Sequence, residues 1–136
     1  MKYNELMMAF AAKCGLPAIE PKDGAVVLEF NGIPMAFMEN EAIDSILLRS
    51  VIGAPPPDAD GSLNKKILRE NYSLCTACGA TLCQDPESKE YVAVLTIPLK
   101  VADEELLLKA IGKMVATVET WKAILASDNS GQYMQV

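Results

Sequence analysis

Alternating apolar residues predict a β-hairpin in the first third of the chain, closed by Asn31-Gly32. Asn-Gly is the preferred two-residue hairpin turn because both of its positions need positive φ. Closing the chain there puts the alternating residues of both arms on one face. These residues are Val26, Leu28, Phe30, Ile33, Met35 and Phe37. We expect this face to pack under the first and last helices. Pro34 cannot donate to a ladder, so we expect it to lie at or near a sheet edge.

The other face of this hairpin is also largely apolar. It carries Ala25, Val27, Glu29, Pro34, Ala36 and Met38 and is only partly polar. Val27, Ala36 and Met38 stand at positions where a solvated sheet normally carries polar side chains. A hairpin with two apolar faces has one side for its own core and another side that is available to a partner.

Helical periodicity predicts three helices, at residues 3–14, about 62–71 and about 103–126. The last helix carries a long apolar stripe with spacings of 4, 3, 4, 3 and 4 residues. Its members are Leu107, Ile111, Met114, Val118, Trp121 and Leu125. Asp103 is placed to serve as the N-cap of this helix, and residues 127–136 are predicted to fray.

Strands are predicted at residues 80–84 and 91–97, whereas residues 43–52 fit a helix or a strand equally well. The resulting order, α-β-β-(β)-α-β-β-α, predicts an α+β fold with a twisted, mostly antiparallel sheet flanked by helices. The Pro-rich loop at residues 53–61 is the only candidate linker, and neither side of it is long enough to form a separate domain.

The length of 136 residues suits one domain, which we expect at residues 1–127, followed by a flexible tail at residues 128–136. Hydrophobic residues make up 51% of the chain, and no apolar run is long enough to cross a bilayer. Glu5 and Lys13 interrupt the N-terminal apolar stretch, which argues against a signal peptide and for a cytoplasmic protein.

Charge and side-chain chemistry favour binding over catalysis. The chain has 12 Lys and Arg against 18 Asp and Glu, a net charge of −6, which argues against nucleic acid or membrane partners. It has no histidine, which removes histidine-based nucleophilic pairs, general bases and metal sites. A calcium-like stretch, Asp58-Ala59-Asp60-Gly61, aligns Pro56 with a required ligand and so fails. We therefore expect no catalytic residue, no metal and no cofactor.

Four cysteines leave one alternative open. Cys75-x-x-Cys78 is followed by Cys83, and Cys14 is far away, whereas zinc sites usually need two close pairs of ligands. A thioredoxin-like motif needs its first cysteine at a helix N-terminus, but this pair follows a predicted helix. We interpret the cysteines as buried and reduced, with Cys14 on the core face of the first helix. A cysteine-based zinc or redox protein remains the alternative.

Short motifs in the second half of the chain occur together in one known family. They are Ile67-Leu68-Arg69-Glu70-Asn71, Gly79-Ala80-Thr81-Leu82, Val92-Ala93-Val94-Leu95, Ile97-Pro98-Leu99 and Val118-Glu119-Thr120-Trp121. In this order they resemble the second helix, fourth strand, fifth strand and last helix of the type III secretion chaperones of the Tir-chaperone (CesT) family. The resemblance covers about residues 2–126 and implies a strand at residues 43–52.

The resemblance implies a non-enzymatic homodimer that binds the N-terminal segment of a secreted effector and keeps it extended and export-competent. It implies a dimer interface at the second helix and the next strand, through Leu63, Ile67, Leu68 and Leu82. We predict effector contacts on the second apolar face of the hairpin, extended by the first helix. The predicted effector-binding residues are Leu6, Met8, Val27, Ala36 and Met38. A non-secretory adaptor or regulator with the same fold is a further alternative.

Overall fold

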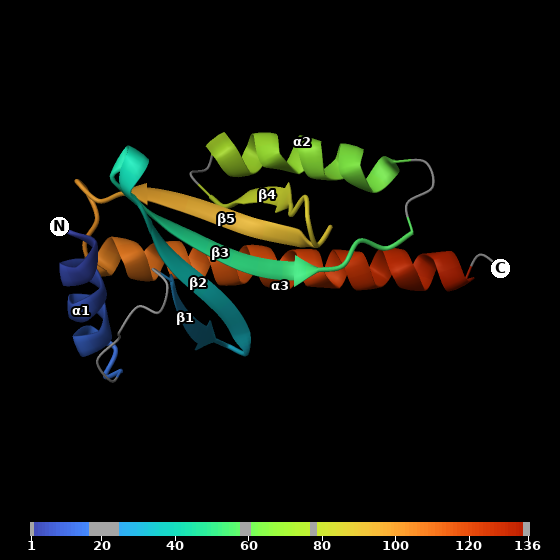
Figure 1. Ribbon diagram of the computed structural model, residues 1–136. Helices are drawn as coiled ribbons and strands as arrows, with labels where there is room; N and C mark the ends of the chain where they lie inside the picture. Colours follow the sequence, from blue (N-terminus) through green and yellow to red (C-terminus); the bar gives the residue numbers. More distant parts are fainter. Residues whose placement is uncertain (1, 17–24, 58–60, 77–78, 135–136) are drawn as a thin grey trace.

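The chain forms a five-stranded antiparallel sheet, with α1 and α3 on one face and α2 beside one edge (Figure 1). The computed structural model describes residues 2–16, 25–57, 61–76 and 79–134, with side chains as far as residue 126. The elements in chain order are α1 (Tyr3–Lys13), β1 (Ala25–Phe30), β2 (Ile33–Asn40), the short 3-10 helix η1 (Glu41–Ile43), β3 (Ser45–Gly53), α2 (Ser62–Thr76), β4 (Thr81–Gln84), β5 (Tyr91–Pro98) and α3 (Glu104–Met134). The predicted order is confirmed, and the ambiguous segment forms β3.

The strand order is β1-β2-β3-β5-β4, and every described pair of neighbours is antiparallel. The hairpin has the predicted register, with Phe30 opposite Ile33. Asn31 and Gly32 have φ values of 52° and 79°, the left-handed conformations that this turn requires. The turn chemistry therefore fixes which side chains of both arms face the core.

Pro34 lies outside the ladder that joins β2 to β3. β2 is an inner strand, but its pairing with β3 begins at Ala36. The missing N–H of Pro34 therefore leaves no hydrogen bond to β3 unmade. Its carbonyl instead accepts a hydrogen bond from Ser50 Oγ at 2.8 Å. The predicted edge position therefore holds locally, although β2 as a whole is not an edge strand.

The core lies between the sheet and the pair α1 and α3. Phe10 of α1 packs against Phe30 and Phe37, with ring centroids 6.4 and 6.3 Å apart. The Tyr3 hydroxyl donates to the Phe37 carbonyl at 3.1 Å, and burial, followed by the negative charge of Glu39, raises the pKa of Tyr3 to about 12. All six residues of the predicted α3 stripe are buried, which confirms the helical face read from their spacing.

Two helices run further than the sequence predicts. Asp103 Oδ1 accepts the Leu106 N–H at 2.7 Å, as expected of an N-cap, but α3 continues to Met134 rather than ending at Ala126. α2 likewise continues to Thr76. Extending an existing helix needs no new nucleus, so residues too weak to start a helix can still prolong one.

Side chains of α2 close the free edge of β4. Asn71 Nδ2 donates to the Leu82 carbonyl at 2.9 Å, and the Leu82 N–H donates to Asn71 Oδ1 at 2.7 Å. Further along, the Tyr91 hydroxyl donates to Asn64 Oδ1 at 2.7 Å. The Asn71 carboxamide thus satisfies both peptide groups that Leu82 would otherwise offer to another strand.

Candidate functional site

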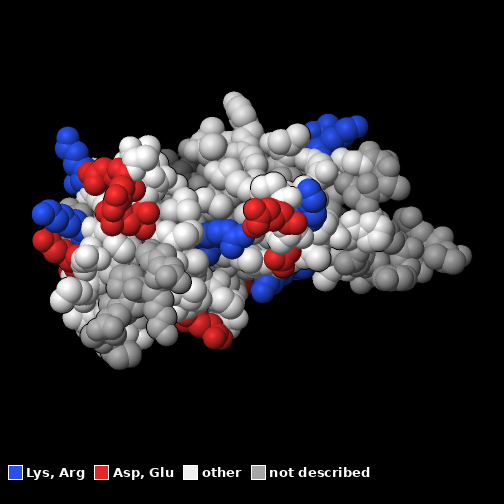
Figure 2. Space-filling view, viewed as in Figure 1, with Lys and Arg blue, Asp and Glu red and all other residues white. Residues whose placement is uncertain are grey.

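The sheet face opposite the core has no helix over it in the described part of the chain. The register aligns its side chains in rows that cross β1, β2 and β3. One row is Val27, Ala36 and Arg49, and the next is Ala25, Met38 and Leu47. Figure 2, seen from this side, shows a broad uncharged area, a blue and red cluster over β3 and the turn between β4 and β5, and further charged side chains at the left and lower edges of the view. We refer to Val27, Ala36, Met38 and Leu47 as the outer hairpin surface.

The structure brings three of the predicted effector-binding residues together on this surface. Val27 is 65% exposed, and Ala36 and Met38 are half-buried beside it. Leu47 adjoins Met38 across the β2–β3 ladder and is not among the predicted residues, because it stands in a continuous apolar run, Ile46-Leu47-Leu48, that shows no alternation. Its direction could not be assigned because the pattern of residues 43–52 also fitted a helix. The result is a continuous apolar strip across three strands.

The two predicted residues of α1 do not extend the outer hairpin surface. Leu6 has no exposed area, because it packs into the core between α1 and the sheet, so the expectation that it forms a contact surface is wrong. Met8 is 67% exposed, but α1 covers the core face of the hairpin, and Val27 points away from that face. Met8 therefore belongs to a different surface of the molecule, where any role in cargo binding stays a proposal.

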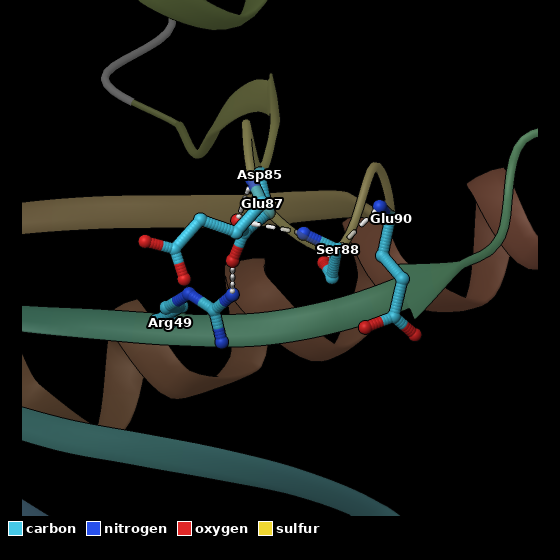
Figure 3. Close-up of polar contacts among 5 residues, drawn as sticks. All are labelled: Arg49, Asp85, Glu87, Ser88 and Glu90. Carbon is cyan, nitrogen blue, oxygen red and sulfur yellow. Dashed lines mark hydrogen bonds and ion pairs between the residues drawn. The ribbon is translucent and has the colours of Figure 1, made fainter.

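One charged pair lies in the middle of the uncovered face (Figure 3). Arg49 Nη2 donates to Asp85 Oδ2 at 2.9 Å, joining β3 to the β4–β5 turn. Asp85 Oδ1 also accepts the Glu87 and Ser88 backbone N–H groups at 2.8 and 3.3 Å. These backbone hydrogen bonds, and next the positive charge of Arg49, lower the pKa of Asp85. Asp85 is therefore a poor base at neutral pH, and its charge is matched by that of Arg49.

The outward side of α2 forms a second apolar surface. Leu68 and Tyr72 lie one helical turn apart and are 70% and 77% exposed. Leu63, Ile67 and Leu82, which were predicted to form the dimer interface with Leu68, are buried in the core of the protomer. The inner side of α2 covers β4, although Ile67 and Leu82 also line a shallow hollow beside Leu68, and a role of these residues in a dimer stays a prediction. Tyr72 was missed, although its spacing of four residues from Leu68 was visible.

The cysteines are not buried in the way that the sequence predicts. Cys14 and Cys75 are exposed free thiols and Cys83 is half-buried, while Cys78 lies outside the described residues. Cys14 follows the last residue of α1 and so lies beyond the buried stripe. Among the residues that the structure describes, no group of three or more Cys, Asp or Glu is arranged to hold a metal ion. None of the described helices is long and apolar enough to span a bilayer.

One family of known sequences matches most of the chain. The sequence model of the Tir chaperone protein (CesT) family matches residues 5–122. A search of the curated proteins finds no match.

Several solved structures share the fold at low sequence identity. The HopA1–SchA chaperone–effector complex contains a chain with a TM-score of 0.78 and 17% identity, covering 89% of this chain and 93% of that one. The Yersinia pestis type III secretion chaperone SycH, solved with a fragment of YscM2, gives 0.72 and 15%, covering 88% and 98%. The ExoU–SpcU complex from the type III secretion system of Pseudomonas aeruginosa gives 0.72 and 16%, covering 88% and 97%. At these identities the likeness establishes the fold.

Proposed function

The chain belongs to the Tir chaperone protein (CesT) family, and from that premise we propose that it is a type III secretion chaperone. In this proposal it binds the N-terminal segment of a secreted effector, here called the cargo, and keeps it unfolded and competent for export. Of the similar structures named above, HopA1–SchA is a chaperone–effector complex, SycH is a type III secretion chaperone, and ExoU–SpcU comes from a type III secretion system, which supports this assignment. Cargo must be bound before it is exported, so we place the protein in the cytoplasm.

The outer hairpin surface is the single observation that carries this proposal. It presents apolar side chains in register on a sheet face where a lone domain normally places polar groups. An extended peptide points every second side chain to the same side, so a segment with apolar residues at those positions can lay them on such a strip. The proposed activity is binding rather than catalysis, because the four residues of this surface carry no ionisable group. Of the carboxylates beside it, Asp85 is paired with Arg49 and has a lowered pKa, and Glu29 is exposed on the same face of β1.

The proposal is tested with the N-terminal segment of a secreted protein encoded next to this chain. We expect the two polypeptides to co-purify as a stable complex when they are co-expressed. Amide resonances of the isotope-labelled segment should show restricted motion in the complex but no globular fold, and proteases should cut only its unbound parts. A segment that folds by itself in the complex, or neighbouring secreted proteins that do not bind at all, would exclude the chaperone function.

We further propose that the protein is a homodimer through the outward side of α2. Leu68 and Tyr72 together expose more apolar surface than a solvated helix usually carries, and covering it is favourable. Light scattering at micromolar concentration should give about twice 14.7 kDa, and the pair Leu68→Glu and Tyr72→Glu should give the monomer.

The matched control for this dimer is Lys66→Glu, which adds negative charge on another exposed side of the same helix. It should leave the mass unchanged. A wild-type monomer under the same conditions would contradict the dimer, and a dimer that survives both glutamates would place the interface elsewhere.

A further inference from the structure

A groove of about 450 Å³ lies between α3 and the end of β5, near the edge of the sheet that is farthest from β1. β4 pairs with β5 only as far as Val94, which lies opposite Thr81, whereas β5 continues to Pro98. The last part of β5 therefore extends past β4, and the groove opens where this part meets α3. Its volume is within the range of about 300–1,000 Å³ that is typical of ligand sites.

The groove has an apolar floor and an apolar rim. Leu95, Ile97 and Ala110 line it and are otherwise buried in the core. Val101 and Leu106 line it as well, but they are 61% and 36% exposed. Large apolar side chains that remain exposed beside a hollow lose contact with water when an apolar group fills it, which favours occupancy.

The charges at the groove have the opposite sign to those of the whole protein. Lys109 and Lys113 of α3 line it, and its described lining contains no acidic residue. The chain as a whole has a net charge of −6. Lys109 forms no ion pair within the described part of the chain. A carboxylate on an occupant would therefore meet a positive group here, whereas it would be repelled over most of the surface.

We propose that this groove binds an extended cargo segment in which one or two apolar side chains lie next to an aspartate or glutamate. This inference rests on the proposed chaperone function and adds a sequence preference to it. The apolar side chains fill the space beside Val101 and Leu106, and the carboxylate reaches Lys109. At the outer hairpin surface Arg49 is already paired with Asp85 and the nearby Glu29 is negative, so this surface does not favour an acidic cargo side chain. The groove adds a preference for an acidic over a basic cargo side chain, and this preference distinguishes cargo from other unfolded chains.

The test uses the full chain, isotope-labelled, and three short synthetic peptides in a Gly and Ser background. The first has two leucines followed by an aspartate, the second has lysine for the aspartate, and the third has serines for the leucines. We expect saturable amide shifts at Leu106, Lys109 and Ala110 with the first peptide and none with the third. Lys109→Glu should weaken the first peptide about fivefold and make the second the better ligand.

The control is Lys122→Glu, which makes the same charge change on another side of α3 and should leave peptide affinity unchanged. Equal affinity for the aspartate and lysine peptides would overturn the inference, as would the absence of shifts at the groove. Shifts at the same amides that depend on protein concentration alone would assign the groove to a second copy. The proposed function fails separately, if the first peptide binds here but no secreted segment forms a complex.

Discussion

The double variant Val27→Lys and Met38→Lys should bind a cargo segment about a hundredfold more weakly, or worse, while the protomer stays folded. Val27 and Met38 are both part of the outer hairpin surface, and neither faces the core. An ammonium group covered by an apolar peptide loses its hydration and gains no partner, which costs several kcal/mol. About 2.7 kcal/mol of lost binding free energy already corresponds to a hundredfold change in Kd.

Calorimetric titration of the labelled segment measures this loss, and circular dichroism melting checks the fold. Leu108→Lys is the matched control, because it puts the same charge on an exposed apolar residue of α3, the helix behind the other face of the sheet. The control should bind cargo as the wild type does. Unchanged affinity in the double lysine variant would move the cargo site away from this surface, and a large fall in Tm would attribute the loss to unfolding.

Phe37→Ala should lower the free energy of unfolding by about 3–5 kcal/mol. The Phe37 ring has no exposed area and contacts the rings of both Phe10 and Phe30, so its removal leaves a cavity where α1 meets the hairpin. Small domains are stable by about 5–15 kcal/mol in total, so this one change removes a large share. The Tyr3 hydroxyl bond goes to the Phe37 backbone and is kept in the variant.

Urea unfolding followed by circular dichroism measures the change. The matched control is Val27→Ala on the neighbouring strand, where the side chain is mostly exposed and the cost should be at most about 1 kcal/mol. Equal costs for the two variants would mean that the two faces of the hairpin have been assigned the wrong way round.

The sequence predicts this hairpin in detail because its signals are local. Asn31-Gly32 sets the turn, the turn sets the register, and period-2 alternation sets the faces. The stripe of α3 is predicted for a similar reason, since six apolar residues at helical spacing leave one choice of buried side. The part of the outer hairpin surface on β1 and β2 follows from these elements. Val27 and Phe30 are three residues apart on one strand, so their side chains point to opposite faces of the sheet.

The outward side of α2, where we propose the dimer contact, is harder to predict, because it depends on where α2 lies. Leu63, Ile67 and Leu68 are neighbours on one helix, and the sequence does not say which of them cover β4. Packing against the strand edge turns Ile67 inward and leaves Leu68 outside. The groove beside α3 is hidden from the sequence for the same reason. It arises where β4 stops short of the end of β5, which is a property of register between distant segments.

The two hydrogen bonds between Asn71 and Leu82 matter for a protein that is proposed to hold unfolded cargo, because such a protein risks aggregating with it. A protein that holds unfolded chains is surrounded by segments ready to become strands, and an open sheet edge is a template for adding them one after another. A carboxamide presents an N–H donor and a carbonyl acceptor side by side, as a peptide backbone does, and one of each is used at Leu82. At this point of the sheet edge, the Leu82 N–H and carbonyl that an incoming strand would pair with are already occupied by a side chain. Cargo is then recognised by its own side chains rather than by the backbone that all polypeptides share. A single asparagine thus helps the protein to hold an unfolded chain without adding it to the sheet.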